Sequence, residues 1–514
     1  MFEQGKALKS QSVKDDKESS FNAVLKALKQ KMRSVYHERS DVDQLAIKRG
    51  LPPFAMREIM SVNPFSAIIP KEYGGLGGDV KESIALMSAA SYESLALSLT
   101  FGINMALFLQ PVIKSGQEEA KANVMRRFLR KQNMGGLMIT EPDFGSDALN
   151  MQTAHTQTNG QYFLKGTKHW AGLTGWADFW LLTARKDTGE GKLARDIDFF
   201  ICDVTQPNQG IVVEEFFENL GLYQIPYGRN RIEVSIPEVQ KLVPEKSGVK
   251  LMLDLLHRSR MSFPGMAMGF IQRMLDEAIQ HCQQRFVGGK SLLKYDQVQQ
   301  RLAQLQSYFT ICSAMCVNSS EKAGLKNDLS AIGIEANTVK SLATDMMQSA
   351  SQTLLQLVGA KGYKLNHIAG RSTVDSRPFQ IFEGSNDMLY SQISEGVIKL
   401  MKKAKQTNLF DFLETFALTQ RASQQVKDLL SFNLNMEMQQ RKLVELGQMI
   451  SRVISVDQVL NLSDKGFSND LISNATTYLR QEINQLKSSF SFGNTVHVIE
   501  DYQADTDWLG FAGK

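Results

Sequence analysis

The chain has 514 residues, of which 43% are hydrophobic and 22% charged, and its formal net charge is +4. This length predicts two to four domains, and the small net charge argues against nucleic acid as the main partner. The sequence contains no uninterrupted apolar run of about 18 residues, so we expect no integral membrane segment.

The N-terminus and the cysteines indicate the setting of the protein. Residues 1–20 mix lysines with acidic residues and lack an apolar stretch, which predicts a flexible N-terminus and neither a secretory signal nor a transit peptide. The cysteines form neither a disulfide framework nor a zinc pattern, so we expect core thiols, no metal site and a cytoplasmic protein. They are Cys202, Cys282, Cys312 and Cys316.

The first predicted domain is helical. Apolar residues recur at steps of three and four from Phe21 to Val35, and helical patterns continue to about residue 131. A glycine-dense loop, Ile69–Gly78, interrupts them. The segment from Asn104 to Pro111 is apolar nearly all round, so we expect it to be buried or to line an apolar tunnel. We predict an N-terminal helical domain over residues 21–133.

The second predicted domain is a β domain over residues 134–247. Short strand-like segments follow one another, separated by turn signals such as Asn159-Gly160, with no helical pattern between them. This order predicts an antiparallel sheet, and no G-x-G-x-x-G motif indicates a Rossmann site. The expected strands are Tyr162–Leu164, Phe179–Thr183, Asp198–Asp203, Ile211–Glu215 and Arg231–Ile236.

The rest of the chain is helical again. Four long segments predict a helical bundle over residues 248–405: Val249–Gln284, Lys294–Ala323, Ile332–Val358 and Asn386–Lys403. Residues 406–514 are expected to form an appended helical extension, with helices at Leu409–Leu418, Gln424–Val456 and Asn469–Lys487. The predicted fold class is α+β: an N-terminal helical domain, a middle antiparallel β domain, a C-terminal four-helix bundle and an appended helical domain.

One carboxylate, Glu383, lies between apolar residues and the polar segment Gly384 to Asp387. Apolar surroundings disfavour the charged form and raise the pKa of a carboxyl, which suits a general base. From spacing alone, an acidic residue in a surface turn before a helix is the commoner interpretation.

Several further motifs follow one another along roughly residues 21–403. They are Ile69–Gly78, Thr140–Asp147, Gly166–Trp170, Arg258–Arg260, Arg285 with Gly288 and Gly289, Gln356–Tyr363 and Phe382–Asp387. Together with the order of domains, these motifs resemble the acyl-CoA dehydrogenase family, whose patterns for the first three are Pro-Glu-Glu-Tyr-Gly-Gly-Leu-Gly-Gly, Thr-Glu-Pro-Gly-Ala-Gly-Ser-Asp and Gly-x-Lys-x-Trp. Phe382–Asp387 and the extension are most similar to the very-long-chain branch. Asp143 and Phe144 replace the Gly-Ala of the second motif.

The resemblance implies an FAD enzyme that oxidises an acyl thioester, with Glu383 as the base for the α-proton and FAD N5 as the hydride acceptor. Some relatives carry the base on the first bundle helix, at about Ser259 here, which cannot serve. The implied substrate-binding residues are Ser146, Arg260, Leu107, Phe108 and Gly384. Arg260 is equally well interpreted as a structural ion-pair residue.

The implied cofactor residues come from several motifs. Gly172 stands where the family has a threonine that bonds the flavin, and Arg285 with the turn Gln356 to Gly359 would reach FAD in a neighbouring subunit. The resemblance therefore implies at least a homodimer. The full set is Met138, Thr140, Gly145, Ser146, Trp170, Gly172, Arg285, Gln356, Gly359, Ser385 and Asp387.

Several alternatives stay open from sequence. We expect fatty acid β-oxidation on acyl-CoA, with electrons passed to an electron-transfer flavoprotein. The acyl group could instead be tethered to a carrier protein, or oxygen could be the acceptor. A different class is a flavin-binding interaction module without dehydrogenase activity. The basic run Lys399 to Lys405 could touch an anionic membrane, although a solvated helix face is the commoner case.

Overall fold

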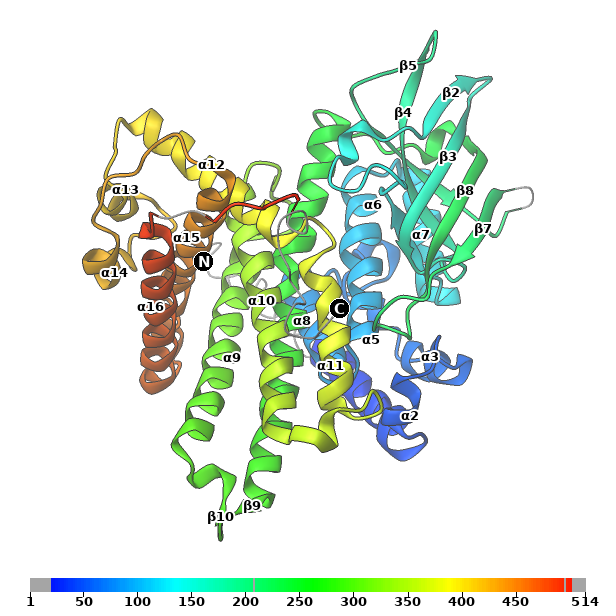
Figure 1. Ribbon diagram of the computed structural model, residues 1–514. Coiled ribbons are helices and arrows are strands. Elements are labelled where there is room, and N and C mark those ends of the chain that lie inside the picture. Colours follow the sequence, from blue (N-terminus) through cyan, green and yellow to red (C-terminus); the bar gives the residue numbers. More distant parts are fainter. Residues whose placement is uncertain (1–19, 207–208, 494–495, 502–514) are drawn as a thin grey trace, which may run out of the picture.

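The computed structural model describes residues 20–206, 209–493 and 496–501. The predicted flexible N-terminus, residues 1–20, lies outside the described residues except for residue 20. In Figure 1 the β domain and the appended helices lie on opposite sides of a central bundle of long helices.

The N-terminal domain is helical, as the sequence predicts. Residues 20–33 form a helix that continues into the π-helix η1 (Ser34–Glu38). The α5, η4 and α6 segments form a run that is 89% buried, and no other described helix is apolar and long enough to span a membrane. The elements are α2 (Val42–Ala46), α3 (Pro53–Met60), α4 (Val80–Glu93), α5 (Leu95–Gly102), the π-helix η4 (Ile103–Leu109), α6 (Gln110–Ser115) and α7 (Glu118–Lys131).

The middle domain is one curled sheet in the order β1-β4-β2-β3-β8-β7, with β5 and β6 paired to β4. Most pairs are antiparallel, but β1–β4 and β2–β4 are parallel, a feature that the prediction of an antiparallel domain missed. The strands are β1 (Gly135–Met138), β2 (Ala154–Thr158), β3 (Gln161–Gly172), β4 (Phe179–Gly189), β5 (Lys192–Leu193), β6 (Asp198–Asp203), β7 (Gly210–Phe216) and β8 (Tyr227–Pro237).

The bundle consists of α8 (Gly248–Gln284), α9 (Asp296–Lys322), α10 (Gly333–Val358) and α12 (Asn386–Ala404), each within two residues of its predicted ends. A short helix that was not predicted, α11 (Ile368–Ser376), precedes the 3₁₀ turn η9 (Arg377–Gln380). A Cβ at Gly269 of α8 would lie 2.0 Å from the Ser88 carbonyl oxygen of α4. Glycine therefore lets the bundle and the N-terminal helices approach closely.

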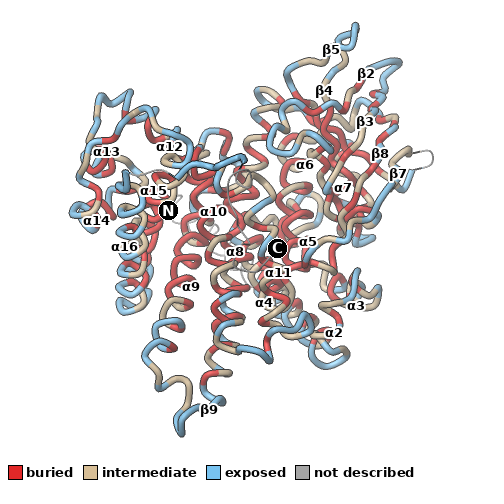
Figure 2. The backbone as a smooth tube through the Cα atoms, viewed as in Figure 1, coloured by how far each residue is buried: buried red, intermediate tan, exposed pale blue. Residues whose placement is uncertain are grey.

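The appended helices are α13 (Leu409–Thr415), α14 (Ser423–Leu430), α15 (Gln440–Leu460) and α16 (Asn469–Ser491). The predicted single helix Gln424–Val456 is wrong, because residues 431–439 are not helical. There Leu409 N–H bonds the Phe432 carbonyl and Leu434 N–H bonds the Thr407 carbonyl, which holds the backbone extended. In Figure 2 the buried part of α15 continues the buried interior of the bundle.

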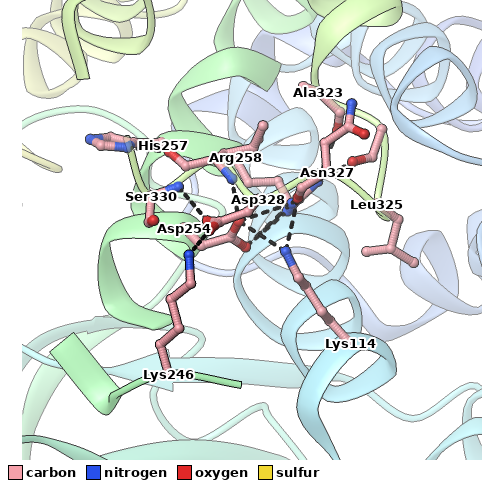
Figure 3. Close-up of polar contacts among 12 residues, drawn as sticks. Lys114, Lys246, Asp254, His257, Arg258, Ala323, Leu325, Asn327, Asp328 and Ser330 are labelled. Atoms are coloured by element: carbon pink, nitrogen blue, oxygen red, sulfur yellow. Dashed lines mark hydrogen bonds and ion pairs between the residues drawn. The ribbon is translucent and has the colours of Figure 1, made fainter. Parts of the chain in front are cut away.

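A buried polar cluster joins the N-terminal helices to the bundle (Figure 3). Asp254 of α8 accepts hydrogen bonds from Lys114 of α6 (3.0 Å) and from Leu329 N–H (2.6 Å) in the α9–α10 loop. Arg258 pairs with Asp254 and donates to the carbonyl oxygen of Asn327 at 2.7 Å. Arg258 thus fixes this loop, whereas Arg260, two residues later, belongs to a different site.

Candidate active site

Glu383 lies in a sharp turn between η9 and α12, which we call the Glu383 turn (residues 381–385). Glu383 has φ 54° and Gly384 has φ 95°, so two successive residues are left-handed. This conformation costs about 1 kcal/mol for a residue that carries a Cβ. A Cβ at Gly384 would lie 2.9 Å from Leu389 and 3.3 Å from the Arg260 guanidinium. The turn therefore requires glycine at position 384.

Two basic side chains from different helices hold the backbone of this turn. Arg260 of α8 donates through Nε (3.1 Å) and Nη2 (2.7 Å) to the Glu383 carbonyl oxygen. Lys340 of α10 donates through Nζ to the Gly384 carbonyl oxygen at 2.8 Å and to Asn386 Oδ1 at 2.9 Å. The third donor group of Arg260, Nη1, bonds Asn337 Oδ1 at 2.7 Å. All the donor nitrogens of Arg260 therefore bind protein, but their acceptors are carbonyl and amide oxygens, so among the described residues Arg260 forms no ion pair of the kind that its structural interpretation expected.

The carboxylate of Glu383 has one engaged and one open oxygen. Ser259 Oγ donates to Oε1 at 2.9 Å. Oε2 is shut off from solvent and has no hydrogen-bond partner among the described residues. Burial raises the pKa of Glu383. The charge of Arg260, the Ser259 hydrogen bond and the charge of Lys340 each lower it, but the effect of burial is larger. A desolvated carboxylate with one open oxygen has the properties of a general base.

Tyr227 of β8 lies beside this carboxylate and was not singled out from the sequence. Burial and the charge of Glu383 both raise the pKa of its hydroxyl. A Cβ at Gly172 would lie 3.3 Å from the Tyr227 ring and 2.8 Å from Ile103 of η4. Gly172 thus leaves room between the end of β3 and the π-helix, where a larger residue would clash.

The predicted flavin residues of the β domain gather around the end of β1 and β3. Trp170, with φ 55°, is 52% exposed and packs its ring 4.5 Å from that of Phe217 and 6.2 Å from that of Tyr227. Thr140 lies beside β3, because its carbonyl oxygen accepts from His169 N–H at 2.8 Å. Met138 is buried, Thr140 half-buried, and Gly145 and Ser146 exposed.

A buried ion pair fixes the loop that carries Gly145 and Ser146. Glu141 accepts hydrogen bonds from the backbone N–H groups of Gln152 (2.6 Å) and Thr153 (2.9 Å) and from Lys168 Nζ (2.9 Å). Lys168 has no exposed surface, and burial lowers its pKa to about 8. The pair thus ties both ends of the loop to β3.

Other predicted cofactor residues lie at the opposite end of the bundle. Arg285 follows α8, and Gln356 and Gly359 end α10. The two ends lie near each other, since burial and then the charges of Lys361, after α10, and Arg285, after α8, lower the pKa of His281 in the last turn of α8. Figure 1 shows this end, next to β9 (Phe286–Val287), far from the sheet. One chain therefore does not bring Arg285 and Trp170 together.

The remaining predicted residues take different places. The Phe108 ring lies in an aromatic stack, 5.7 Å from Phe128 and 5.9 Å from Phe179, so it serves the core between the helices and the sheet. Leu107 is half-buried in η4. Ser385 precedes α12 as its N-cap without a capping hydrogen bond, and Asp387 is exposed in the first turn.

Three family models match consecutive parts of the chain. They are acyl-CoA dehydrogenase, N-terminal domain, over residues 22–132, middle domain, over residues 136–234, and C-terminal domain, over residues 246–398. Residues beyond 398, including the appended helices, lie outside all three matches.

Individual relatives agree with these matches. An acyl-CoA dehydrogenase of Bacillus subtilis is 26% identical over 342 residues, which cover 65% of this chain and 87% of that protein. The structure of butyryl-CoA dehydrogenase from Megasphaera elsdenii has a TM-score of 0.64 at 21% identity and covers 73% of this chain and 98% of its own.

A longer structural match includes part of the extension. The acyl-CoA dehydrogenase of Bacillus anthracis, solved with FAD, has a TM-score of 0.74 at 16% identity and covers 92% of this chain and 88% of its own. Residues 1–405 alone could not supply that coverage, so the similarity of fold reaches into the appended helices.

Proposed function

Because this chain belongs to the acyl-CoA dehydrogenase family, and so is an oxidoreductase that acts on acyl-CoA, we propose that Glu383 is its catalytic base. The proposed reaction converts an acyl-CoA to the trans-2-enoyl thioester, with Glu383 removing the α-proton. The observation that carries this proposal is Glu383 Oε2, a buried carboxylate oxygen without a partner among the described residues. An orphaned acceptor of this kind is costly unless a ligand supplies its partner.

The Glu383 turn also offers a donor for the thioester oxygen. Negative charge develops on that oxygen as the α-proton leaves, so an aimed N–H stabilises the transition state. Within the described part of the chain, no acceptor binds the Glu383 N–H, while Arg260 and Lys340 hold the two following carbonyls. We therefore assign the Glu383 N–H to the thioester oxygen and Oε2 to the α-proton.

The residues present fit FAD. Trp170 exposes an apolar ring, a Cβ at Gly145 would meet no atom within 4 Å, and Arg285 is exposed with no ion pair among the described residues. FAD, when bound, supplies the acceptor for the hydride that leaves the β-carbon. Its ring would rest on the β-domain residues and its phosphates on Arg285 and Gln356 of a second copy. The rest of the proposed set is Met138, Thr140, Ser146, Gly172, Gly359, Ser385 and Asp387.

The separation of Arg285 from Trp170 supports a homo-oligomer as the active form. Each cofactor site would take its β-domain face from one copy and its arginine fork from another, since a guanidinium suits phosphate oxygens. We further propose that an electron-transfer flavoprotein reoxidises the enzyme.

Anaerobic titration with acyl-CoAs of increasing chain length tests the reaction, read by loss of the flavin's visible absorbance. We expect bleaching with one chain-length optimum in the wild type, and its loss in Glu383→Gln. Glu395→Gln, on an exposed residue of the same helix α12, is the matched control and should behave as wild type.

Each of three other outcomes would refute one part of the proposed function. A protein that binds FAD but is bleached by no acyl-CoA would refute the CoA substrate, and carrier-bound thioesters would be titrated next. A protein that cannot bind FAD would refute the flavoenzyme. Reoxidation of the bleached enzyme by air as fast as by electron-transfer flavoprotein would refute the proposed acceptor.

A further inference from the structure

The appended helices contact the active site through a chain of buried polar groups that begins at Asp345 of α10. Asp345 Oδ1 accepts hydrogen bonds from Gln380 Nε2 at 2.6 Å and from Asn386 Nδ2 at 2.7 Å. Gln380 ends η9 and Asn386 begins α12, so the two donors flank the Glu383 turn. One carboxylate therefore holds the turn at both of its ends.

The second oxygen of Asp345 leads away from the turn. Tyr390 of α12, which is wholly buried, donates its hydroxyl to Asp345 Oδ2 at 2.7 Å. Asp345 has no ion pair within 4.0 Å among the described residues, although the Tyr390 hydroxyl and two side-chain amides converge on it. Two basic side chains act on Asp345 from beyond ion-pair distance: Lys340, which shares Asn386 with it, and a second one on the far side of Tyr390.

The second basic side chain is Arg452 of α15, in the appended helices. Arg452 is 9% exposed and interacts with Tyr390 and Asp345 on one side and with Glu482 of α16 on the other. Its Nε donates to Glu482 Oε2 at 3.0 Å. A single guanidinium therefore lies between a carboxylate of the bundle and a carboxylate of the extension.

The backbone of α15 is held close enough for this contact. A Cβ at Gly447 would lie 2.0 Å from the Tyr390 carbonyl oxygen, so only glycine permits α15 to lie directly on α12 here. One turn away, Ser394 Oγ donates to the Leu443 carbonyl at 2.6 Å. Arg452 is thus presented to Tyr390 by a fixed helix and not by a flexible segment.

We propose that Arg452 is a positioning residue for Glu383: through Tyr390 and Asp345, the appended helices hold the turn that carries the catalytic carboxylate. The proposal rests on the proposed function of Glu383 for its catalytic consequence. It assigns the extension a part in catalysis although residues beyond 398 lie outside the matched family domains. Arg452 itself touches neither substrate nor cofactor in this scheme.

The test compares Arg452→Met with Arg480→Met. Arg480 lies on α16 and pairs at 3.0 Å with the exposed Asp428, so its loss removes a similar charge from the extension without reaching Asp345. The rate of backbone hydrogen exchange at residues 377–390 should rise at least about tenfold in Arg452→Met and stay unchanged in Arg480→Met. A tenfold rise corresponds to a loss of about 1.4 kcal/mol in the free energy of local opening. In Arg452→Met the rate of flavin reduction at saturating acyl-CoA should also fall about tenfold, while KM stays nearly unchanged.

Two further variants keep the test decisive if Arg452→Met does not fold. Tyr390→Phe removes only the hydroxyl between Arg452 and Asp345, and should reproduce both effects. Tyr36→Phe is its matched control, because Tyr36 is also buried, at 1% exposed, but lies in η1 of the N-terminal helical domain and not in the Arg452 network. Arg452→Lys, which keeps the charge, should restore part of the rate.

A double-mutant cycle tests the route. If Arg452 acts through Asp345, the double variant Asp345→Asn with Arg452→Met should lose little more rate than the worse of the two single variants, within about twofold. Losses that multiply in the double variant would overturn that route. Lower thermal stability in Arg452→Met with unchanged exchange at 377–390 and unchanged rate would overturn the proposal. If the wild type reduces no flavin with any acyl thioester, the proposed function fails, while the exchange comparison still decides whether Arg452 holds the turn.

Discussion

Ser259 Oγ of α8 donates a hydrogen bond to Glu383 Oε1 at 2.9 Å, which leaves Oε2 as the open oxygen of the carboxylate. Ser259, the position at which the resemblance places the base of some relatives, thus binds the proposed base of this chain. The hydrogen bond lowers the pKa of Glu383 against the larger effect of burial, which raises it.

Ser259→Ala should therefore shift the pH dependence of flavin reduction. Without this hydrogen bond the pKa of Glu383 rises further, and the base is deprotonated only at higher pH. We expect kcat/KM on the acidic limb of the pH profile to fall by about tenfold, because a hydrogen bond to a charged group is worth about 1.5 kcal/mol, and to approach wild type at high pH. Ser307→Ala on α9, where the hydroxyl bonds only the Ala303 carbonyl, is the control. A uniform loss at all pH values would contradict this account.

Lys340 should make the stability of the protein pH-dependent. Burial lowers its pKa to about 7, whereas an unfolded lysine titrates near about 10.4. Between these values the unfolded chain binds a proton that the folded chain does not, so rising pH stabilises the folded state. The thermal midpoint of wild type minus that of Lys340→Met should therefore increase from about pH 7 to about pH 9. Lys427→Met, at an exposed site on α14, should show no such trend.

Gly384→Ala should abolish most activity. The added Cβ would meet Leu389 and Arg260 at a left-handed residue, so the turn and its contact with Arg260 must move. We expect flavin reduction to slow at least about a hundredfold, because a misplaced carboxylate would raise the activation free energy by about 3 kcal/mol. Gly160→Ala has a similar φ, +74°, but meets no atom within 4 Å, so it should lower stability and leave the rate unchanged. Equal rate losses in the two variants would refute a local effect.

Mixed oligomers should reveal a shared cofactor site. Trp170→Ala and Arg285→Ala should each weaken FAD binding, because one removes the ring surface and the other the phosphate fork. When both variants are co-expressed with different tags, a purified heterodimer contains one site with both residues intact. Its FAD content should approach one per two chains, while each variant alone retains little. Absence of recovery in the heterodimer would place Trp170 and Arg285 in different sites.

Much of the fold follows from local patterns in the sequence. The long bundle helices were predicted within two residues because apolar periodicity accumulates over twenty or more positions. The nine-residue α11 offers too few turns for this signal. The break at residues 431–439 depends on pairing with Thr407 and Leu409, a contact distant in sequence that no local window contains.

The candidate site likewise contains one residue that the sequence singles out and several that only the structure brings to it. The sequence motif around Glu383 identified this carboxylate as the candidate catalytic base, and that role stays a prediction. Ser259, Lys340, Asp345 and Tyr227 come from three other elements, and each has an ordinary local pattern: a serine between arginines, charged residues on an amphipathic helix, and a tyrosine in a strand. Their roles arise only when α8, α10 and β8 meet the Glu383 turn.

The close contact of Gly447 with Tyr390 also has a genetic consequence. Val397 and Met401, both fully buried, share a face of α12 with Tyr390, whose carbonyl oxygen lies against Gly447 of α15. A stop codon directly after Lys405 would leave the apolar face of α12 without its cover and Asp345 without Arg452. Such an allele would not encode a minimal enzyme, and roughly the last fifth of the coding sequence could be lost only after the apolar surface that it covers had been replaced.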